Sequence, residues 1–279
     1  MIWKLKKRSL DLSRQARVMG ILNVTPDSFS DGGKYEGLEK AMARAREMVS
    51  QGATIIDVGG ESTRPGATPV GADEETHRIF SVIAALRAEW DGFISIDTTK
   101  CSVAAVALAA GADIINDISG LTAEPEMAEL CAMKDCGIVV MHMQGSPETM
   151  QENPVYENVT GEIQAFFQER LATLTALGIS PDRICFDPGI GFGKSLAHNL
   201  ELLRNIARLA PAGSPLLLGV SRKSFLAKTT AATEPTDRDA PTAALTALTR
   251  SKGIMLHRVH AVKENLAALR ITEALLHQK

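Results

Sequence analysis

The sequence has few cysteines, little net charge and no long apolar run, and each shortage excludes a class of protein. Its 279 residues include 4 cysteines without a CxxC pair, so we expect neither a disulfide framework nor a zinc site. The formal net charge of −3 predicts no basic surface for nucleic acid or membranes. No stretch approaches the ~18 apolar residues of a membrane-spanning helix. The charged start of the chain has no apolar segment behind it, so we expect a cytoplasmic protein without a secretory signal.

The sequence does contain a repeated pattern, in which an apolar run ends on a polar residue and is followed by a loop and a segment with helical spacing. Its composition, 45% hydrophobic and 23% charged, is typical of a folded protein with a sizeable core. Continuous apolar runs indicate parallel strands that are buried on both faces. The expected strands are 18–22, 54–56, 93–96, 113–115, 138–141, 184–186, 216–220 and 254–256, and the later helices include 196–209 and 243–251.

Eight strand–helix units predict a single (β/α)8 TIM barrel, a fold of typically ~250 residues. An open, doubly wound sheet is the alternative. The barrel is favoured because every strand, and not only those at one switch point, ends on a polar or charged residue. No linker or low-complexity segment interrupts the pattern. Residues 18–279 are therefore expected to form one barrel domain, and residues 1–17 a short N-terminal extension packed over one end.

The carboxyl ends of barrel strands converge on one bowl, which is where active sites of this fold lie. One acid at a strand end is as often a helix N-cap as a functional residue. Polar residues at all the strand ends favour an active site instead. The residues expected in the bowl are Asn23, Asp57, Asp97, Asn116, His142, Asp187, Lys223, Arg258 and His260.

These residues suggest two kinds of ligand group. The set Asp97, Asn116, Asp187 and Lys223 fits a flat heterocycle with an amino and an amide group on its edge. A structural Asp–Lys ion-pair network is the alternative. Arg258 and His260 follow the last strand, near the usual phosphate site of these barrels, and predict a bound phosphate. Arg64, on the loop after the second strand, is a candidate third cation.

The glycine-rich stretch at residues 187–194, DPGIGFGK, resembles a P-loop without being one. The P-loop pattern needs a glycine where Pro188 stands, and the dinucleotide fingerprint needs one at Lys194. We expect these glycines to let a ligand ring approach the backbone. Met141 and Phe192 are expected to pack against the ring faces or to fill the top of the barrel.

Two long segments resemble the signature sequences of the dihydropteroate synthases. They are residues 20–33, GILNVTPDSFSDGG, and residues 56–66, IDVGGESTRPG. Shorter motifs continue the likeness in order, at residues 96–98, 115–117, 141–145, 187–189, 221–224 and 258–260. The resemblance runs from about residue 18 to the end. It implies a TIM-barrel homodimer that acts in folate biosynthesis.

The resemblance also implies a reaction and its residues. Such enzymes join 4-aminobenzoate to 6-hydroxymethyl-7,8-dihydropterin diphosphate, release diphosphate, need Mg²⁺ and are blocked by sulfonamides. The implied pterin-binding residues are Asp97, Asn116, Asp187 and Lys223, with Met141, Phe192 and Gly219 also lining the substrate site. Asn23 is implied to bind Mg²⁺ and the diphosphate, and Arg258 and His260 are also implied to bind the diphosphate. Thr63 is implied to contact the substrate. Phe29, Ser62, Arg64, Pro65 and Ser224 are implied at the aminobenzoate site. The implied catalytic residues are Asn23, Asp97, Lys223, Arg258 and His260.

The chemistry expected is a dissociative substitution, in which diphosphate leaves and the electron-rich pterin ring shares the charge of the methylene. Arg258, His260 and the metal would neutralise the leaving group. We expect no covalent enzyme intermediate, because neither Ser62 nor Ser221 has a histidine beside it in the sequence. The loops after the first two strands are expected to close over the site.

The chain departs from the family pattern at Cys101, at Ala261 and over residues 233–242. None of these departures removes an implied ligand. Two other functions stay open. A pterin-dependent methyltransferase would share the Asp–Asn–Asp pocket without needing the phosphate-binding residues or the two long loops. A non-catalytic pterin-binding paralogue would keep the pocket without turnover.

Overall fold

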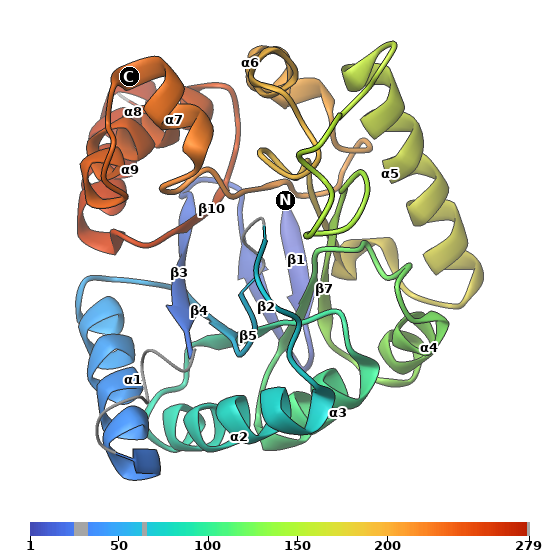
Figure 1. Cartoon of the computed structure of the whole chain (residues 1–279), viewed down its shortest axis with the longest axis vertical. Coiled ribbons are helices and arrows are strands. Elements are labelled where there is room, and N and C mark those ends of the chain that lie inside the picture. Colours follow the sequence, from blue (N-terminus) through green and yellow to red (C-terminus); the bar gives the residue numbers. More distant parts are fainter. Residues whose placement is uncertain (25–32, 63–65, 278–279) are drawn as a thin grey trace.

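A ring of parallel strands surrounded by helices dominates the computed structural model, which describes residues 1–24, 33–62 and 66–277 (Figure 1). The strands of the ring pair in the order β8–β7–β6–β5–β4–β3–β10–β9. A parallel bridge between Phe186 and Leu216 joins the two ends. The predicted (β/α)8 barrel is thereby confirmed. The strands are β3 (Arg17–Asn23), β4 (Ile55–Gly59), β5 (Phe93–Asp97), β6 (Ile114–Asp117), β7 (Gly137–Met141), β8 (Ile184–Asp187), β9 (Leu217–Leu218) and β10 (Leu256–Val259).

Helices follow the strands in turn and form the outer layer of the barrel (Figure 1). They are α1 (Gly33–Ser50), α2 (Ala72–Glu89), α3 (Cys101–Ala110), α4 (Pro125–Met133), α5 (Val159–Ala176), α6 (Leu196–Arg204), α7 (Ser224–Thr230), α8 (Asp239–Ser251) and α9 (Val262–His277). The helix expected over 196–209 ends at Arg204 and continues only as a 3₁₀ turn at Ile206–Arg208. The short α7 was not predicted, since two turns carry too little periodicity to be recognised. No helix of the described ranges has both the length and the apolar character needed to cross a membrane.

An N-terminal hairpin closes one end of the barrel. Its strands, β1 (Ile2–Leu5) and β2 (Arg8–Asp11), pair antiparallel and lie across the middle of the ring in Figure 1. Trp3, Leu5, Leu10 and Leu12 pack in one cluster with a side chain from each strand of the ring. Those eight are Met19, Ile55, Phe93, Ile114, Val139, Cys185, Leu217 and Leu256. The segment expected as a polar extension is therefore the apolar cover of the barrel.

Several of the same strands carry a polar residue two positions further along. Alternate residues of a strand point to the same face. The polar residues therefore lie in the barrel interior, above the apolar layer and at the carboxyl ends of the strands. The pairs are Ile55 and Asp57, Ile114 and Asn116, Cys185 and Asp187, and Leu256 and Arg258.

Candidate active site at the carboxyl end of the barrel

Four polar side chains from separate strands form one network inside the barrel. Arg258 on β10 donates from Nε to Asp57 Oδ2 at 2.6 Å and from Nη2 to Asp97 Oδ2 at 2.5 Å. Asn116 Nδ2 donates to the same Asp57 oxygen at 3.1 Å. Asp57 and Asn116 are buried. The network fixes the Asp97 carboxylate at the mouth of the barrel.

The network changes two interpretations made from the sequence. The sequence predicts Asp57 in the bowl but gives it no ligand to bind. In the structure it accepts hydrogen bonds from both Arg258 and Asn116. Arg258 was assigned to the phosphate group and Asp97 to the heterocycle group. The structure joins these groups, because both side chains point into the same narrow barrel interior.

Two oxygens of the network are buried without a hydrogen-bond partner in the described part of the chain, Asp57 Oδ1 and Asp97 Oδ1. Burial raises the pKa of Asp97 to about 7, an effect that Arg258 opposes and Asp57 reinforces. A buried polar atom without a partner costs free energy until a donor reaches it. The orphaned oxygen of Asp97 is therefore a position where a ligand N–H would be stabilised.

Asp187, at the end of β8, is the second acid of the pocket. Its Oδ1 accepts a hydrogen bond from the Gly189 N–H at 2.7 Å. A Cβ atom at position 219 would lie 3.5 Å from Asp187 Oδ2, so Gly219 leaves the approach to this oxygen clear. Burial raises the pKa of Asp187, and the charge of Lys223 opposes that shift.

Lys223 is held by the glycine-rich segment and not by an acid. Its ammonium donates to the Ile190 carbonyl and lies 4.5 Å from the centre of the Phe192 ring. Burial lowers the pKa of Lys223 to about 8, against the effect of Asp187. No ion pair between Lys223 and Asp187 occurs among the salt bridges of the described residues, so the alternative of a structural Asp–Lys network is not what the structure shows.

The glycines of residues 187–194 serve a different purpose from the one predicted. Gly189 and Gly193 adopt positive φ angles of 62° and 61°. A Cβ atom there would lie 1.9 Å from the His142 carbonyl oxygen and 2.4 Å from that of Gln144. The glycines therefore admit the loop that follows β7, and the expectation that they admit a ligand ring is wrong for these two positions.

Lys194 was not predicted as part of the site, yet only 2% of it is exposed. Its Nζ lies 3.1 Å from His142 Nδ1 and donates to the carbonyls of Phe192 at 2.9 Å and His142 at 3.3 Å. Burial lowers the pKa of Lys194 to about 7 and that of His142 to about 3. His142 is thus a neutral acceptor. The only signal in the sequence was a lysine placed directly after three spaced glycines.

A cavity of about 440 Å³ brings Asn23 and His260 together. Its other lining residues are Ile21, Leu22, Lys40, Ala41, Arg44 and Arg222. Arg44 donates to the His260 carbonyl at 2.6 Å. Three cationic side chains and a histidine line this cavity and favour an anionic ligand. Two of the cations already have carboxylate partners, because Arg44 pairs with Glu47 at 2.6 Å and Arg222 with Asp239 at 2.7 Å.

Ser221 and His260 are neighbours, although they are far apart in the sequence. Ser221 Oγ lies 3.0 Å from His260 Nδ1 and accepts a hydrogen bond from the His260 N–H at 3.1 Å. The sequence places no histidine near Ser221, but the fold does, since β9 and β10 are adjacent strands. Ser221 is buried, and its oxygen is occupied by a main-chain N–H, which leaves it poorly placed to attack a substrate.

The remaining predicted residues have varied positions. Met141 is buried at the end of β7, Phe192 is half-buried, and Ser224 is exposed at the start of α7. Ser62 is half-buried at the edge of the second loop. The predictions for Phe29, Thr63, Arg64 and Pro65 lie outside the described residues.

The residues present fit a metal that arrives with its substrate. Within residues 1–24, 33–62 and 66–277, no group of three or more His, Cys, Asp or Glu side chains could hold an ion. Asn23 is exposed and offers one amide oxygen. Mg²⁺ usually keeps several waters and binds one or two protein oxygens together with substrate phosphates. A single amide oxygen beside an anion cavity is consistent with that mode.

Known proteins share this architecture and sequence. Residues 19–260 match the family described as pterin binding enzyme. The dihydropteroate synthase of Escherichia coli strain K12 is 45% identical over 271 residues, which cover 97% of this chain and 95% of that protein. The Yersinia pestis dihydropteroate synthase, solved as a sulfonamide drug complex, is 43% identical with a TM-score of 0.93 over the full length of both chains. The Xanthomonas albilineans dihydropteroate synthase, solved with 4-aminobenzoic acid, is 40% identical with a TM-score of 0.92, also over both full chains.

Proposed function

Because the chain belongs to the dihydropteroate synthases, a family of pterin-binding enzymes, we propose that its barrel mouth performs their reaction. It joins 4-aminobenzoate to 6-hydroxymethyl-7,8-dihydropterin diphosphate and releases 7,8-dihydropteroate and diphosphate. The observation that carries this function is the Asp97 carboxylate, which Arg258 holds while its buried Oδ1 has no hydrogen-bond partner among the described residues. That oxygen is a site for the N–H groups of a pterin ring.

The pterin lies between the acids of β5 and β8. Its amino and amide N–H groups donate hydrogen bonds to Asp187, which accepts them through the oxygen that faces Gly219. Asn116 can both donate and accept on the ring edge, and Lys223 donates to a ring nitrogen or oxygen. Lys223 is already fixed by the Ile190 carbonyl, so little conformational entropy is lost when it binds.

The main role of Arg258 is to hold the two carboxylates of the pterin pocket, Asp57 and Asp97. Its guanidinium faces two carboxylates, so its charge is compensated in this state. Contact with the diphosphate would require Arg258 to exchange one of these partners. The cavity lined by Asn23 and His260 also contains Lys40, Arg44 and Arg222, and these basic groups would receive the departing diphosphate. Arg44 and Arg222 would share it with their present partners, Glu47 and Asp239.

Mg²⁺ is part of the proposal. Asn23 would offer its amide oxygen to an ion carried by the diphosphate, and the ion would neutralise charge on the leaving group. The chain's own residues orient both substrates and exclude water around the methylene carbon. The reaction proceeds without a covalent intermediate on Ser221, because this residue is buried and its oxygen accepts a hydrogen bond from the His260 N–H.

4-Aminobenzoate attacks the methylene through its amine, beside Ser62 and Ser224 at the rim of the barrel. Sulfonamides carry the same aryl amine and compete for this position. Such competition fits the likeness to a relative that was solved with a sulfonamide drug. A cytoplasmic location stays a prediction from the sequence.

The reaction is tested with purified protein, the two substrates and Mg²⁺, with dihydropteroate measured as the product. Formation of dihydropteroate that a sulfonamide suppresses is the expected result. Pterin binding without product would favour the non-catalytic paralogue. Methyl transfer from a methylated folate would favour the methyltransferase, a function for which the cationic cavity beside Asn23 has no use.

A homodimer is also proposed, with α8 and α9 as its interface. Leu248 on α8 is 53% exposed, and Ile271 and Leu275 on α9 are 61% and 71% exposed. Apolar side chains gathered on two packed helices favour burial against a second chain. Light scattering should report a dimer for the natural protein and a monomer for an Ile271→Glu, Leu275→Glu variant. A monomeric natural protein would contradict the interface.

A further inference from the structure

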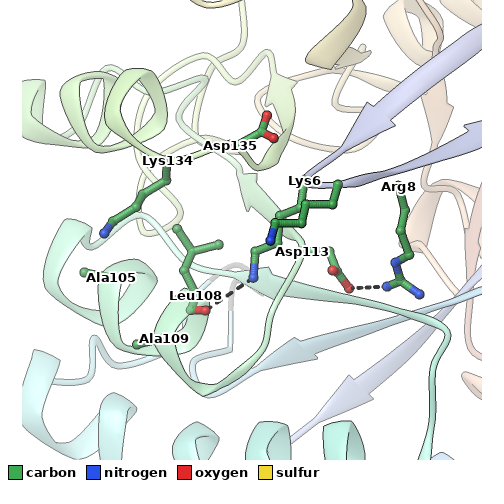
Figure 2. Close-up of a pocket in the computed structure, with 9 residues that line it drawn as sticks. Lys6, Arg8, Ala105, Leu108, Ala109, Asp113, Lys134 and Asp135 are labelled. Carbon is green, nitrogen blue, oxygen red and sulfur yellow. Dashed lines mark hydrogen bonds and ion pairs between the residues drawn. The ribbon is translucent and has the colours of Figure 1, made fainter.

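A second cavity, of about 520 Å³, lies at the hairpin end of the barrel, opposite the active site (Figure 2). Small-molecule sites usually have volumes of roughly 300–1,000 Å³. Four segments line it, namely the hairpin turn, α3, the residue before β6 and the residues that follow α4. The lining residues are Lys6, Lys7, Arg8, Ala105, Leu108, Ala109, Asp113, Lys134 and Asp135.

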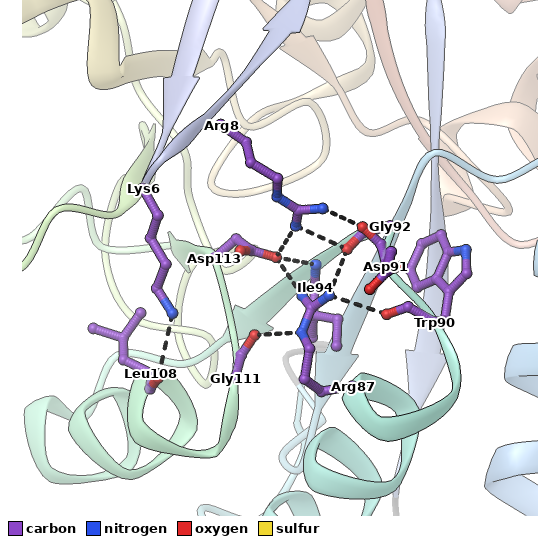
Figure 3. A network of polar contacts seen from close by, with 10 residues as sticks. All are labelled: Lys6, Arg8, Arg87, Trp90, Asp91, Gly92, Ile94, Leu108, Gly111 and Asp113. Carbon is purple, nitrogen blue, oxygen red and sulfur yellow. Dashed lines mark hydrogen bonds and ion pairs between the residues drawn. The ribbon is translucent and has the colours of Figure 1, made fainter.

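The charge of this cavity is unbalanced. Asp113 is already satisfied, since it accepts hydrogen bonds from Arg87 at 2.5 Å, from the Ile94 N–H at 3.0 Å and from Arg8 at 3.1 Å (Figure 3). The Asp135 side chain is 69% exposed and lies 3.9 Å from Arg183. Asp113 is thus compensated by Arg8 and Arg87, while the lining lysines Lys6, Lys7 and Lys134 form no ion pair within the part of the chain that the structure describes. The cavity therefore has a net positive field.

Lys6 is the cation that this arrangement satisfies least. It occupies the hairpin turn with a φ of 54° and is half-buried. Its Nζ donates to the Leu108 carbonyl at 3.4 Å, which is the long end of hydrogen-bond length, as Figure 2 shows. No carboxylate of the described residues forms an ion pair with it. Burial lowers the pKa of Lys6, against the effect of Asp113. An anion at this position would form charge-assisted hydrogen bonds with the ammonium and so compensate for the water that burial removes.

The wall contributed by α3 is apolar. Ala105, Leu108 and Ala109 face the cavity, and the carbon chains of the lysines add apolar surface around it. Two of the three α3 residues are alanines, so the space beside the helix is not filled by its own side chains. A ligand that matches both parts of the cavity has an apolar body and an anionic head.

We propose that this cavity binds a small organic anion, with an alkyl or aryl group against α3 and a phosphate or carboxylate head at Lys6. Such a ligand would connect the hairpin turn to α3 and so stabilise the cover of the barrel. The site is separate from the active site, because its residues lie at the amino ends of the strands. It does not depend on the reaction proposed above.

The test uses hexyl phosphate as the probe, with hexanol and inorganic phosphate as matched controls. Calorimetry is performed in a buffer without phosphate or diphosphate, and the resonances that shift distinguish this cavity from the one beside Asn23. We expect hexyl phosphate to bind one to one, at least tenfold more tightly than either control. Amide resonances of residues 6–8 and 105–109 should shift. Equal binding of hexanol, or shifts confined to the carboxyl end of the barrel, would overturn the proposal.

Variants test the two parts of the cavity separately. Lys6→Met should weaken hexyl phosphate binding tenfold or more, whereas Lys6→Arg should retain it. Ala105→Leu fills the apolar wall and should also abolish binding without changing the charge. Lys263→Met, at an exposed lysine near the start of α9, is the control and should bind normally. Unchanged binding in Lys6→Met or in Ala105→Leu would show that the cavity is not the site.

Discussion

The guanidinium of Arg258 lies 2.5 Å from the carboxylate of Asp97, and the two residues come from strands β10 and β5, which are not adjacent in the barrel. Breaking a buried ion pair from one side leaves the other charge uncompensated, at a typical cost of about 3–5 kcal/mol. The pocket proposed for the pterin therefore depends on a residue that the family resemblance assigns to the diphosphate.

Arg258→Ala should weaken the binding of 6-hydroxymethyl-7,8-dihydropterin, which carries no phosphate, by at least tenfold. The reason is that Asp57 and Asp97 then face each other without a cation, which favours protonation of one of them. His260→Ala should weaken only the diphosphate-bearing substrate. Calorimetry with both ligands distinguishes the two variants. Normal pterin affinity in Arg258→Ala would contradict this prediction. It would support the interpretation from the sequence, in which Arg258 serves only the phosphate group.

Lys100 should position the second loop for 4-aminobenzoate. Its Nζ lies 2.6 Å from Glu61 Oε2 and 2.7 Å from Glu75 Oε2, and Glu61 Oε1 accepts from the Val70 N–H at 2.8 Å. These contacts tie both ends of residues 59–70 to α2 and to the loop after Asp97. Lys100→Met should raise the KM for 4-aminobenzoate about tenfold and leave pterin affinity within twofold.

The stability of Lys100→Met provides a control for the role of the buried charge. Glu75 is fully buried, so Lys100→Met should also lower the free energy of unfolding, by about 3 kcal/mol. Adding Glu75→Gln removes the uncompensated charge and should recover most of that loss. If the double variant is no more stable than Lys100→Met, the buried charge is not the cause.

Lys194 should make the folded protein more stable as the pH rises above neutrality. Its pKa is lowered to about 7 in the folded state, whereas an unfolded lysine has a pKa of about 10.4. Between these values the unfolded chain binds more protons, so the free energy of unfolding increases with pH, by up to about 1.4 kcal/mol per pH unit. Urea unfolding at pH 7 and pH 9 should show this slope, and Lys194→Met should remove it. Identical slopes in both proteins would contradict the lowered pKa.

Trp3 should contribute to stability without contributing to catalysis. It is fully buried, and its Nε1 donates to the Arg183 carbonyl at 2.9 Å. Trp3→Ala should lower the free energy of unfolding by about 3–5 kcal/mol. Turnover at a temperature where the variant is folded should stay within about twofold. Ile2→Ala, at a neighbouring side chain that is 48% exposed, should change the stability by less than about 0.5 kcal/mol.

Much of the barrel can be predicted from the sequence because parallel strands buried on both faces need continuous apolar runs. The residues that end those runs locate the site for the same reason, since Asp97, Asn116 and Asp187 each follow one. The runs do not say which interior side chains face each other across the barrel. The pairing of Arg258 with Asp57 and Asp97 depends on strand tilt and register, which only the assembled structure fixes.

The hairpin was missed for a local reason. Its turn contains Lys6 and Lys7, where a two-residue hairpin would usually have Asn or Gly. Lys6 nevertheless adopts a positive φ, because tertiary packing of Trp3 and Leu5 outweighs its local preference. The contacts of Lys194 with His142 and of Ser221 with His260 were missed because they join segments that are distant in the sequence.

The cover of the barrel has a consequence for how the chain is made. The hairpin leaves the ribosome before every strand of the ring, but its cluster includes Leu256, on the strand of the ring that is synthesised last. Trp3 therefore stays without its full set of neighbours until almost the whole chain has emerged. Contacts of such long sequence separation slow folding. Burial of Trp3 should thus mark the completion of the barrel and not its beginning.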